Sequence, residues 1–270
     1  TDFFPRPGKR NGAWMTSYKE QYIDKQGNDS RPHISIVCNF TRPTTSAPSL
    51  LTFGELTTLF HEFGHALHGM LSKVTYPSLS GTNVARDFVE LPSQLMENWC
   101  YEEETLRLFA THYQTGEPLP IEWVQKIKEA SAFMEGILSV RQLNFGFLDM
   151  AWHTYPHLER LESVRPFEQE ATKVTQLYPP IETMCISPAF SHIFSGGYAA
   201  GYYSYKWSEV LDADAFEVFK QAGIFNIEVA TRFRREILEK GSSEKESLLY
   251  KRFRGQDPTP DALIRRAFGE

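Results

Sequence analysis

The chain has 270 residues, of which 41% are hydrophobic and 23% charged, so it can bury a large core. Its formal net charge is -6 and no stretch concentrates Lys and Arg, which argues against nucleic acid and anionic membrane as partners. No apolar run reaches the length of a membrane span, and three widely separated cysteines favour free thiols in a reducing, cytoplasmic compartment.

Prolines and glycines punctuate the start of the chain, which predicts a loop. Residues 33–40, HISIVCNF, alternate in polarity and contain β-branched side chains, which predicts a strand. From about Phe53 onward the pattern is helical. Four interruptions of this pattern predict loops, near residues 76–87, 115–120, 154–168 and 178–197. The sequence therefore predicts a mainly α protein with a small β-sheet.

A helix with two unlike faces is predicted from Thr52 to about Ser72. Thr52 and Glu55 match a capping box, in which each side chain satisfies a free backbone N–H at the helix start. Apolar residues share one side of this helix, namely Leu59, Phe63, Ala66, Leu67 and Met70. His61, His65 and His68 lie together on the opposite side. The apolar side explains how the helix is buried, but it does not explain the histidines.

Two of these histidines indicate a metal site. His61 and His65 are four residues apart, so their imidazoles lie one turn apart and can both reach a single tetrahedral metal. Glu62 lies beside them, where it could accept a proton from water activated by that metal. HEFGH is thus an HExxH pattern of zinc hydrolases. Solvated, incidental histidines are the competing interpretation, and the glutamate within an amphipathic helix of this kind argues against it.

The class of zinc site depends on the third ligand. A metzincin would have Gly at position 68 and His at position 71, where this chain has His68 and Leu71, so that class is excluded. His68 lies a full turn beyond His65, too far along the axis to join both other histidines. We expect it to support the site from outside the ligand set or to be solvated.

A carboxylate from a second segment is the remaining possibility. Residues 85–99 contain Asp87, Glu90 and Glu97 close to a predicted helix start. Glu90 is preferred, because Asp87 would then lie about one turn away and could hydrogen-bond a ligand histidine. Spacing alone leaves Glu97 open as the alternative.

Three long segments carry a family resemblance. The chain closely resembles the thimet-oligopeptidase family of zinc peptidases in HEFGHALHG, in YPSLSGTNVARDFVELPSQLMENW and in FSHIFSGGYAAGYYSYKW. The resemblance implies a helical catalytic domain of the HExxH plus Glu type, with a small β-sheet beside the active-site helix. That single domain would span residues 1–270, with a loop and sheet region at 1–52, zinc-binding helices at 53–112 and a helical region with a tyrosine-rich substrate loop at 113–270.

The same resemblance assigns roles to individual residues. It implies that His61, His65 and Glu90 bind one zinc ion per chain and that Glu62 is the general base. It also implies that Tyr205 stabilises the oxyanion, with Tyr198, Tyr202 and His192 lining the site. The spacing of the three tyrosines predicts hydroxyls on one helix face, although a packed aromatic stripe would have the same spacing. Gly196 and Gly197 suit a mobile loop before them.

The implied function is zinc-dependent hydrolysis of short unfolded peptides, as an oligopeptidase or a dipeptidyl carboxypeptidase. An extended peptide could pair with the edge of the strand at 33–40. Releasing C-terminal dipeptides needs a group that binds the free carboxylate, and Arg86 is a candidate, with a structural salt bridge as the competing role.

Members of this family are longer, and the chain resembles only their C-terminal catalytic part. The alternative function is therefore binding of zinc and peptide without turnover, because the N-terminal channel wall is missing. A structural metal would need four protein ligands, and only three are visible. An apolar surface left by the absent part would favour a partner chain or self-association.

Overall fold

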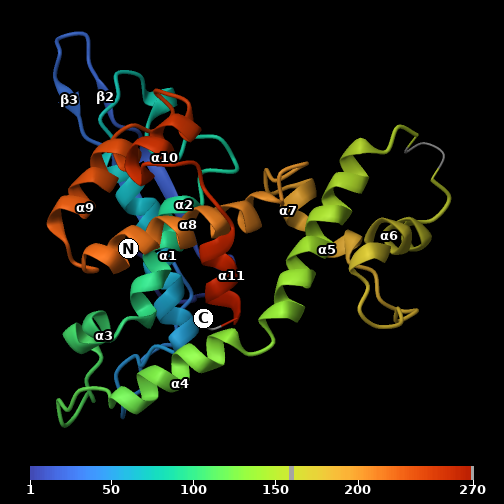
Figure 1. Cartoon of the computed structure of the whole chain (residues 1–270), viewed down its shortest axis with the longest axis horizontal. Helices are drawn as coiled ribbons and strands as arrows, with labels where there is room; N and C mark the ends of the chain where they lie inside the picture. Colours follow the sequence, from blue (N-terminus) through green and yellow to red (C-terminus); the bar gives the residue numbers. More distant parts are fainter. Residues whose placement is uncertain (158–160, 269–270) are drawn as a thin grey trace.

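Helices dominate the structure, as predicted (Figure 1). The computed structural model describes residues 1–157 and 161–268. Its α-helices are α1 (Phe53–Leu71), α2 (Leu91–Glu97), α3 (Glu103–Phe109), α4 (Ile121–Ala132), α5 (Glu135–Thr154), α6 (Val164–Thr172), α7 (Ser191–Phe194), α8 (Ser204–Ala222), α9 (Ile227–Phe233), α10 (Glu246–Arg254) and α11 (Asp261–Phe268). Short 3₁₀ turns are η1 (Pro77–Leu79), η2 (Asn98–Tyr101), η4 (Lys173–Thr175) and η5 (Ser187–Ala189), and η6 (Arg234–Leu238) is a π-helix.

The β-structure consists of two small antiparallel pairs. β1 (Trp14–Lys19) pairs with β4 (His33–Val37), with Trp14 opposite Val37, and β2 (Tyr22–Ile23) pairs with β3 (Asp29–Ser30). The predicted strand at 33–40 is confirmed as β4. Its other edge is partly occupied, because Asp2 bridges Val37 and accepts a hydrogen bond from the Cys38 N–H at 2.9 Å. The Phe40 N–H likewise donates to the carbonyl oxygen of Phe3, so a peptide could pair with this edge only before Ile36.

Helix α1 lies between the sheet and the larger helical core. Ala66 packs with Ile36, Cys38 and Phe40 of the sheet region, whereas Leu67 packs against the core built from α2, α8, α9 and α10. The predicted division of α1 into an apolar and a histidine side is only partly right. Phe63 and Met70 are 43% and 37% exposed, while His68 is completely buried.

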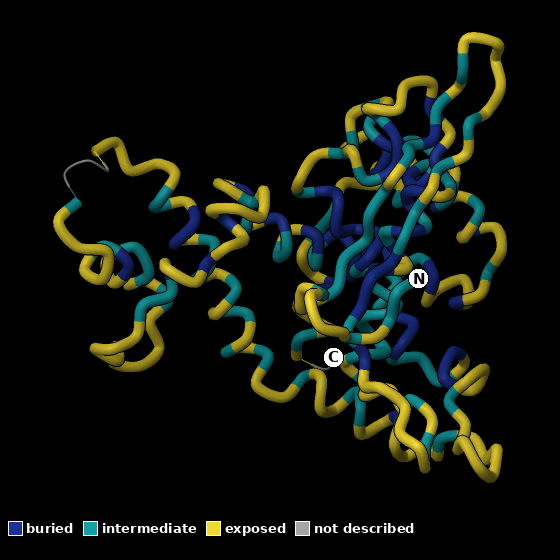
Figure 2. Tube along the Cα trace, turned by 180° about the vertical axis from the view of Figure 1, so that it is seen from behind, coloured by how far each residue is buried: buried dark blue, intermediate teal, exposed yellow. Residues whose placement is uncertain are grey.

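Helices α5, α6 and α7 form an arm that projects from this core, to the right in Figure 1. Much of the arm is exposed (Figure 2), and its own small cluster contains Leu148, Phe190 and Ile193. The loop predicted at 154–168 is wrong from Val164, where α6 begins, and residues 158–160 of it lie outside the described residues. The loop predicted at 178–197 contains η5 and α7. Short helices such as α7 leave little periodicity in a sequence.

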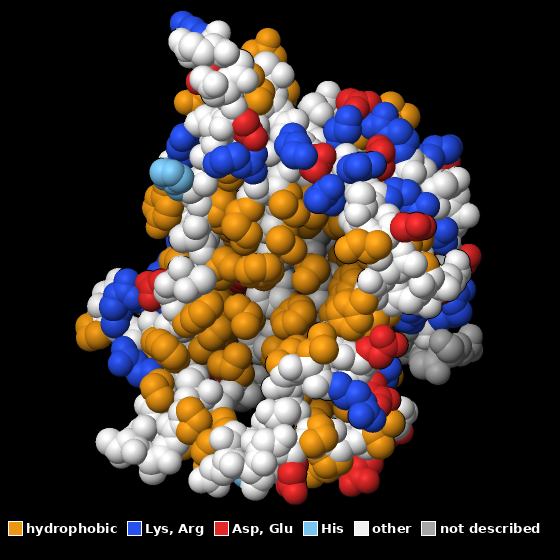
Figure 3. Space-filling view, turned by 90° about the vertical axis from the view of Figure 1, so that its left-hand side faces the viewer, with side chains coloured by type: hydrophobic (Ala, Val, Ile, Leu, Met, Phe, Trp, Pro, Cys, Tyr) orange, Lys and Arg blue, Asp and Glu red, His pale blue; other side chains and the backbone are white. Residues whose placement is uncertain are grey.

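One face of the molecule exposes many apolar side chains. Figure 3 shows a broad apolar area on the face of the molecule that carries α3 and α9. Exposed apolar side chains on these helices and on α1 include Leu108, Phe109, Ile227 and Phe63.

All three cysteines are free, as predicted. Within the described residues, no helix combines the length and apolar character that crossing a membrane requires.

Candidate metal centre

The histidine helix begins where the capping box predicts. The Thr52 hydroxyl accepts a hydrogen bond from the Glu55 N–H at 3.2 Å, and the Glu55 carboxylate accepts one from the Thr52 N–H at 2.9 Å. Glu55 also accepts from the N–H of Thr41 at 2.6 Å, which ties the loop after β4 to the helix start. The start of α1 is therefore fixed two turns before its histidines.

His61, His65 and Glu90 converge on one point. The Nε2 atoms of the two histidines lie 3.3 and 3.2 Å from Oε2 of Glu90, and the three ligand atoms lie within 4.8 Å of one another. Glu90 immediately precedes α2, and Pro92 follows it in the first turn, where the missing N–H costs nothing. The structure thus brings together the three residues expected to bind the metal.

Gly64, between the two histidines, allows this approach. A Cβ atom at Gly64 would lie 2.4 Å from the carbonyl oxygen of Pro92, closer than any side-chain carbon can come. Only glycine therefore lets α1 touch the first turn of α2. Sequence reasoning missed this role, although the glycine lies inside the HEFGH motif.

The charges of the three groups depend on one another. Burial alone would lower the pKa of His61, but hydrogen bonds to Glu90 and Glu97 outweigh it and raise that pKa to about 10. Burial would raise the pKa of Glu90, yet the hydrogen bonds from His61 and His65 hold it well below its usual range. A divalent cation at this point would replace imidazole protons as the partner of the carboxylate. Two nitrogens and one carboxylate oxygen fit zinc.

Glu62 is buried beside this cluster without a hydrogen-bond partner among the described residues. Its side chain is 5% exposed, and its Oε2 atom and Nδ1 of His65 are both buried and unpaired. Burial raises the pKa of Glu62, with the negative charges of Glu90 and Glu97 adding to the effect and the two histidines opposing it. Unpaired polar atoms next to a ligand set are consistent with a site that receives a metal and a substrate.

Glu97, the alternative third ligand, lies outside the ligand set. Its Oε1 atom is 2.7 Å from Nδ1 of His61, so it accepts the proton of the ring nitrogen that faces away from Glu90. Such a partner fixes the orientation and tautomer of a ligand histidine. Asp87, expected to do this, instead accepts a hydrogen bond from the Tyr203 hydroxyl at 2.8 Å, so that expectation is wrong.

His68 is neither a ligand nor solvated. Both ring nitrogens are buried without a partner among the described residues, and burial, with repulsion from His65, lowers the pKa of His68 to about 3. It is therefore a neutral side chain inside the protein. The prediction of a solvated position failed because α1 is covered on more than one side.

The tyrosines reach the ligands from the far side of the site. The Tyr198 hydroxyl donates to Oε1 of Glu90 at 2.8 Å, and the Tyr205 ring stacks on Tyr198 with centroids 5.0 Å apart. Burial and the nearby Glu90 charge raise the pKa of Tyr198 to about 12, and burial and Tyr198 raise that of Tyr205 further. Both hydroxyls are therefore protonated donors at neutral pH.

Tyr202 and His192 complete the aromatic group. The His192 ring lies 6.2 Å from Tyr198 and 6.4 Å from Tyr205, whereas Tyr202 packs against the small cluster of the arm. The shared helix face predicted for the three tyrosines is wrong in its geometry, because α8 begins only at Ser204 and Tyr198 and Tyr202 precede it outside any helix.

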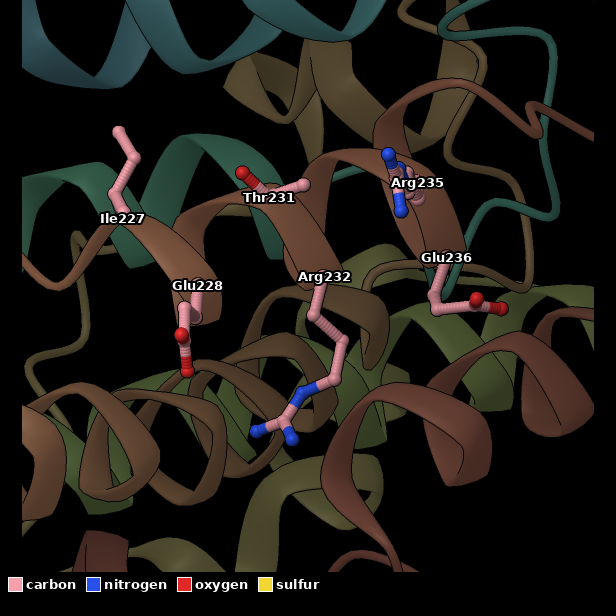
Figure 4. Close-up of a pocket in the computed structure, with 6 residues that line it drawn as sticks. All are labelled: Ile227, Glu228, Thr231, Arg232, Arg235 and Glu236. Atoms are coloured by element: carbon pink, nitrogen blue, oxygen red, sulfur yellow. The ribbon is translucent and has the colours of Figure 1, made fainter.

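The surface has two hollows, of which one adjoins the cluster and the other lies elsewhere. A cleft of about 840 Å³ adjoins Glu97 and is lined by residues of α2, α4, α5, α8 and α11. A smaller hollow of about 360 Å³ lies on α9 and η6 (Figure 4), and its Glu236 is paired with Arg252. None of the residues lining the smaller hollow is a predicted ligand, so it plays no part in the site.

The sequence of the whole chain decides the family. Residues 1–268 match peptidase family M3. The chain belongs to this family. Among its M3 relatives, oligopeptidase A of Escherichia coli (strain K12) is 44% identical over 264 residues, and dipeptidyl carboxypeptidase of the same organism is 42% identical over 258 residues. These matches cover 97% and 95% of this chain.

The match covers only part of each relative. The chain spans 39% of the length of oligopeptidase A and 37% of that of dipeptidyl carboxypeptidase. The crystal structure of a putative oligoendopeptidase F from Bacillus anthracis has a similar fold, with a TM-score of 0.57 at 19% sequence identity. That likeness covers 99% of this chain and 39% of the solved one. The fold is thus shared at low identity.

Proposed function

We propose that residues 1–270 form one catalytic domain that hydrolyses peptide bonds in short unfolded peptides with the help of one zinc ion. The observation that carries this proposal is the convergence of His61, His65 and Glu90 beside the unpaired carboxylate of Glu62. The names of the M3 relatives describe peptidases, and they give no support to the alternative of binding without turnover. We propose the same three parts within this domain: a loop and sheet region at 1–52, zinc-binding helices at 53–112 and a helical region with the tyrosine-rich substrate loop at 113–270.

His61, His65 and Glu90 would hold the zinc ion. Three protein ligands are typical of catalytic rather than structural zinc, which has four. When bound, zinc supplies Lewis acidity and lowers the pKa of water towards about 7. Glu97 would keep the His61 ring oriented towards the ion through its 2.7 Å contact with Nδ1.

Glu62 would be the general base. Its carboxylate is buried, has no hydrogen-bond partner among the described residues and has a pKa raised by burial, so it is a stronger proton acceptor than an exposed glutamate. It would accept the proton of the attacking water and later donate it to the leaving amine. A carboxylate held in a fixed ion pair could not do this as readily.

The tyrosine hydroxyls would bind the developing oxyanion. Tyr205 is the proposed donor, and its raised pKa keeps its proton in place at neutral pH. A single such donor contributes about 10² to 10³ in rate. Tyr198, Tyr202 and His192 would line the same site, with Tyr198 also holding Glu90.

Arg86 favours release of C-terminal dipeptides as a second candidate activity. Its guanidinium lies 4.8 Å from the centre of the Tyr198 ring, and it forms no ion pair with a carboxylate of the described residues. The competing role, a structural salt bridge, is therefore not seen. A free cation beside a group that contacts Glu90 could bind the terminal carboxylate of a peptide.

The proposed partners and location rest on the exposed apolar surface and on the names of similar proteins. The apolar area on α3, α9 and α1 could pack against a second chain, either a copy of this one or one that supplies what the longer relatives have. Short peptides are the proposed substrates, and nucleic acid and membrane are not proposed as partners. We propose the cytoplasm, noting that similar proteins of Arabidopsis thaliana are named as cytosolic and organellar enzymes.

The products from a decapeptide with a free C-terminus test this function. We expect zinc-loaded wild type to cleave it and Glu62→Gln, with equal zinc, to leave it intact by mass spectrometry. Stepwise loss of C-terminal dipeptides would identify a dipeptidyl carboxypeptidase, and internal cuts would identify an oligopeptidase. An intact peptide with one zinc per chain bound would contradict the proposal and favour binding without turnover.

A further inference from the structure

A buried carboxylate lies behind the tyrosines, outside the proposed catalytic groups. Asp149 is on α5, and its side chain is completely buried. Its two oxygens accept hydrogen bonds from the backbone N–H groups of Ala200 at 2.9 Å and Tyr202 at 2.8 Å. Nδ1 of His153, one turn further along α5, lies 2.8 Å from the same carboxylate. Each Asp149 oxygen thus holds one backbone donor of the segment that carries the tyrosines.

This segment, residues 195–203, is called here the tyrosine loop. It lacks regular structure and has an unusual backbone. Ala200 adopts a left-handed conformation with φ of 51°, which costs free energy for any residue except glycine. Gly197 has φ of 82°. A loop with this backbone needs fixed partners to persist, and the charged Asp149 oxygens are stronger acceptors than a neutral amide oxygen.

The loop determines where the tyrosine hydroxyls lie. Tyr198 reaches Glu90 from the loop itself, and Tyr205 follows the loop by two residues and stacks on Tyr198. Within the described residues, the side chains that hydrogen-bond to backbone N–H groups of the loop belong to Asp149 alone. A shift of Ala200 or Tyr202 would therefore move the hydroxyls relative to the metal ligands.

We propose that Asp149 is a positioning residue that orders the tyrosine loop over the metal centre. It contacts neither substrate nor metal, and it acts through the backbone of Ala200 and Tyr202. Its effect on turnover rests on the proposed peptidase function, whereas the ordering of the loop does not. Because Asp149 lies on α5 of the arm, the position of the tyrosines depends on the arm being folded.

Amide hydrogen exchange tests the ordering directly. Asp149→Asn keeps the shape but replaces one acceptor oxygen by an NH₂ donor that faces a backbone N–H. We expect exchange across residues 196–205 to rise about tenfold or more, as for loss of a hydrogen bond to a charged group. Zinc content should stay at the wild-type value, and any peptidase activity should fall mainly in kcat.

Glu168→Gln is the matched control, because Glu168 is a buried carboxylate of the same arm. It accepts from the N–H groups of Ile186 and Ser187 and does not touch the tyrosine loop. An equal rise at 196–205 in both variants would overturn the proposal, since it would mean general loosening of the arm. Unchanged exchange in Asp149→Asn would overturn it as well.

The wild-type protein provides a test that needs no variant. The Ala199 N–H has no hydrogen-bond partner among the described residues, whereas those of Ala200 and Tyr202 are bound to Asp149. We expect the Ala200 and Tyr202 amides to exchange more slowly than that of Ala199. Equal exchange rates for the three amides would contradict the role of Asp149. This test depends neither on the folding of Asp149→Asn nor on peptidase activity.

Discussion

The two sides of the proposed metal centre are built differently. The ligand side consists of α1 and the start of α2, which touch at Gly64 within a buried core. The tyrosine side is a loop without regular structure that depends on the exposed arm and on the buried carboxylate of Asp149. Metal ligands must be held rigidly before the metal binds, whereas groups that close on a substrate need room to move. We therefore expect changes on the ligand side to affect metal binding and changes on the tyrosine side to affect turnover.

Glu62→Gln should have the largest effect on turnover without touching metal binding. The variant cannot accept a proton, so we expect kcat to fall by about 10² to 10⁴, the range for general acid–base catalysis. Zinc per chain, measured by mass spectrometry of the metal, should equal that of wild type. Retained activity would show that another group is the base.

Tyr205→Phe should lower kcat by about 10² to 10³ with little change in KM, as for loss of one oxyanion donor. Tyr155→Phe is its control, because the Tyr155 ring packs on Phe167 in the arm, outside the proposed site. We expect nearly wild-type kinetics for this control. Equal losses in the two variants would show that the effect does not arise from the Tyr205 hydroxyl.

Glu97→Gln should weaken zinc binding by about 10 to 100-fold, the usual effect of losing the outer partner of a ligand histidine. The measurement is competition with a chromophoric chelator. Glu102→Gln, a nearby change at a partly exposed ion pair with Lys128, should leave the affinity unchanged. An unaltered affinity in Glu97→Gln would mean that the ligand side is rigid without this contact.

Gly64→Ala tests the packing of the ligand side. The added Cβ would meet the Pro92 backbone, so we expect a loss of about 1–3 kcal/mol in the free energy of unfolding, together with weaker zinc binding. Gly54→Ala is the control on the same helix, because nothing lies within 4 Å of its added carbon. The measurement is the free energy of unfolding of both variants, obtained by denaturant titration. A stable Gly64→Ala protein with normal zinc would contradict the close-packing argument.

The stability of the metal-free protein should depend on pH in a defined way. Glu90 has a folded pKa well below 4.5, so its contribution is present above that value and is lost as pH falls below it. His61 has a folded pKa of about 10 against 6.5, so its contribution is complete below 6.5 and disappears as pH rises towards 10. His68 has a folded pKa of about 3 against 6.5, so its neutral buried form costs stability as pH falls below 6.5. We therefore expect the highest Tm near pH 6.5. Zinc should reverse the upper part of this profile, and its failure to do so would argue against His61 as a ligand.

Much of the ligand side could be predicted from local sequence. The Thr52 and Glu55 cap and the spacing of His61 and His65 depend only on helix geometry, which a sequence states directly. Spacing could not choose between Glu90 and Glu97, because both lie close to one helix. The family resemblance made that choice, and in the structure Glu90 clusters with His61 and His65 whereas Glu97 lies outside this cluster.

The tyrosine side was harder to predict. Asp149 is separated from Ala200 by 51 residues and binds a backbone N–H, which leaves no pattern of side chains in the sequence. His68 was expected to support the site from outside the ligand set or to be solvated, because its helix face was judged from one apolar stripe. Burial of a helix on several sides depends on which elements pack on it, and that information is not local.

Zinc stoichiometry tests the central claim most directly. Protein prepared without an affinity tag would be loaded with excess zinc, dialysed and measured for zinc per chain, as wild type, as Glu90→Gln and as the control Glu168→Gln. We predict one zinc per chain in wild type and in the control, and a clear loss in Glu90→Gln. No zinc in wild type, or full zinc in Glu90→Gln, would contradict a metal centre formed by His61, His65 and Glu90.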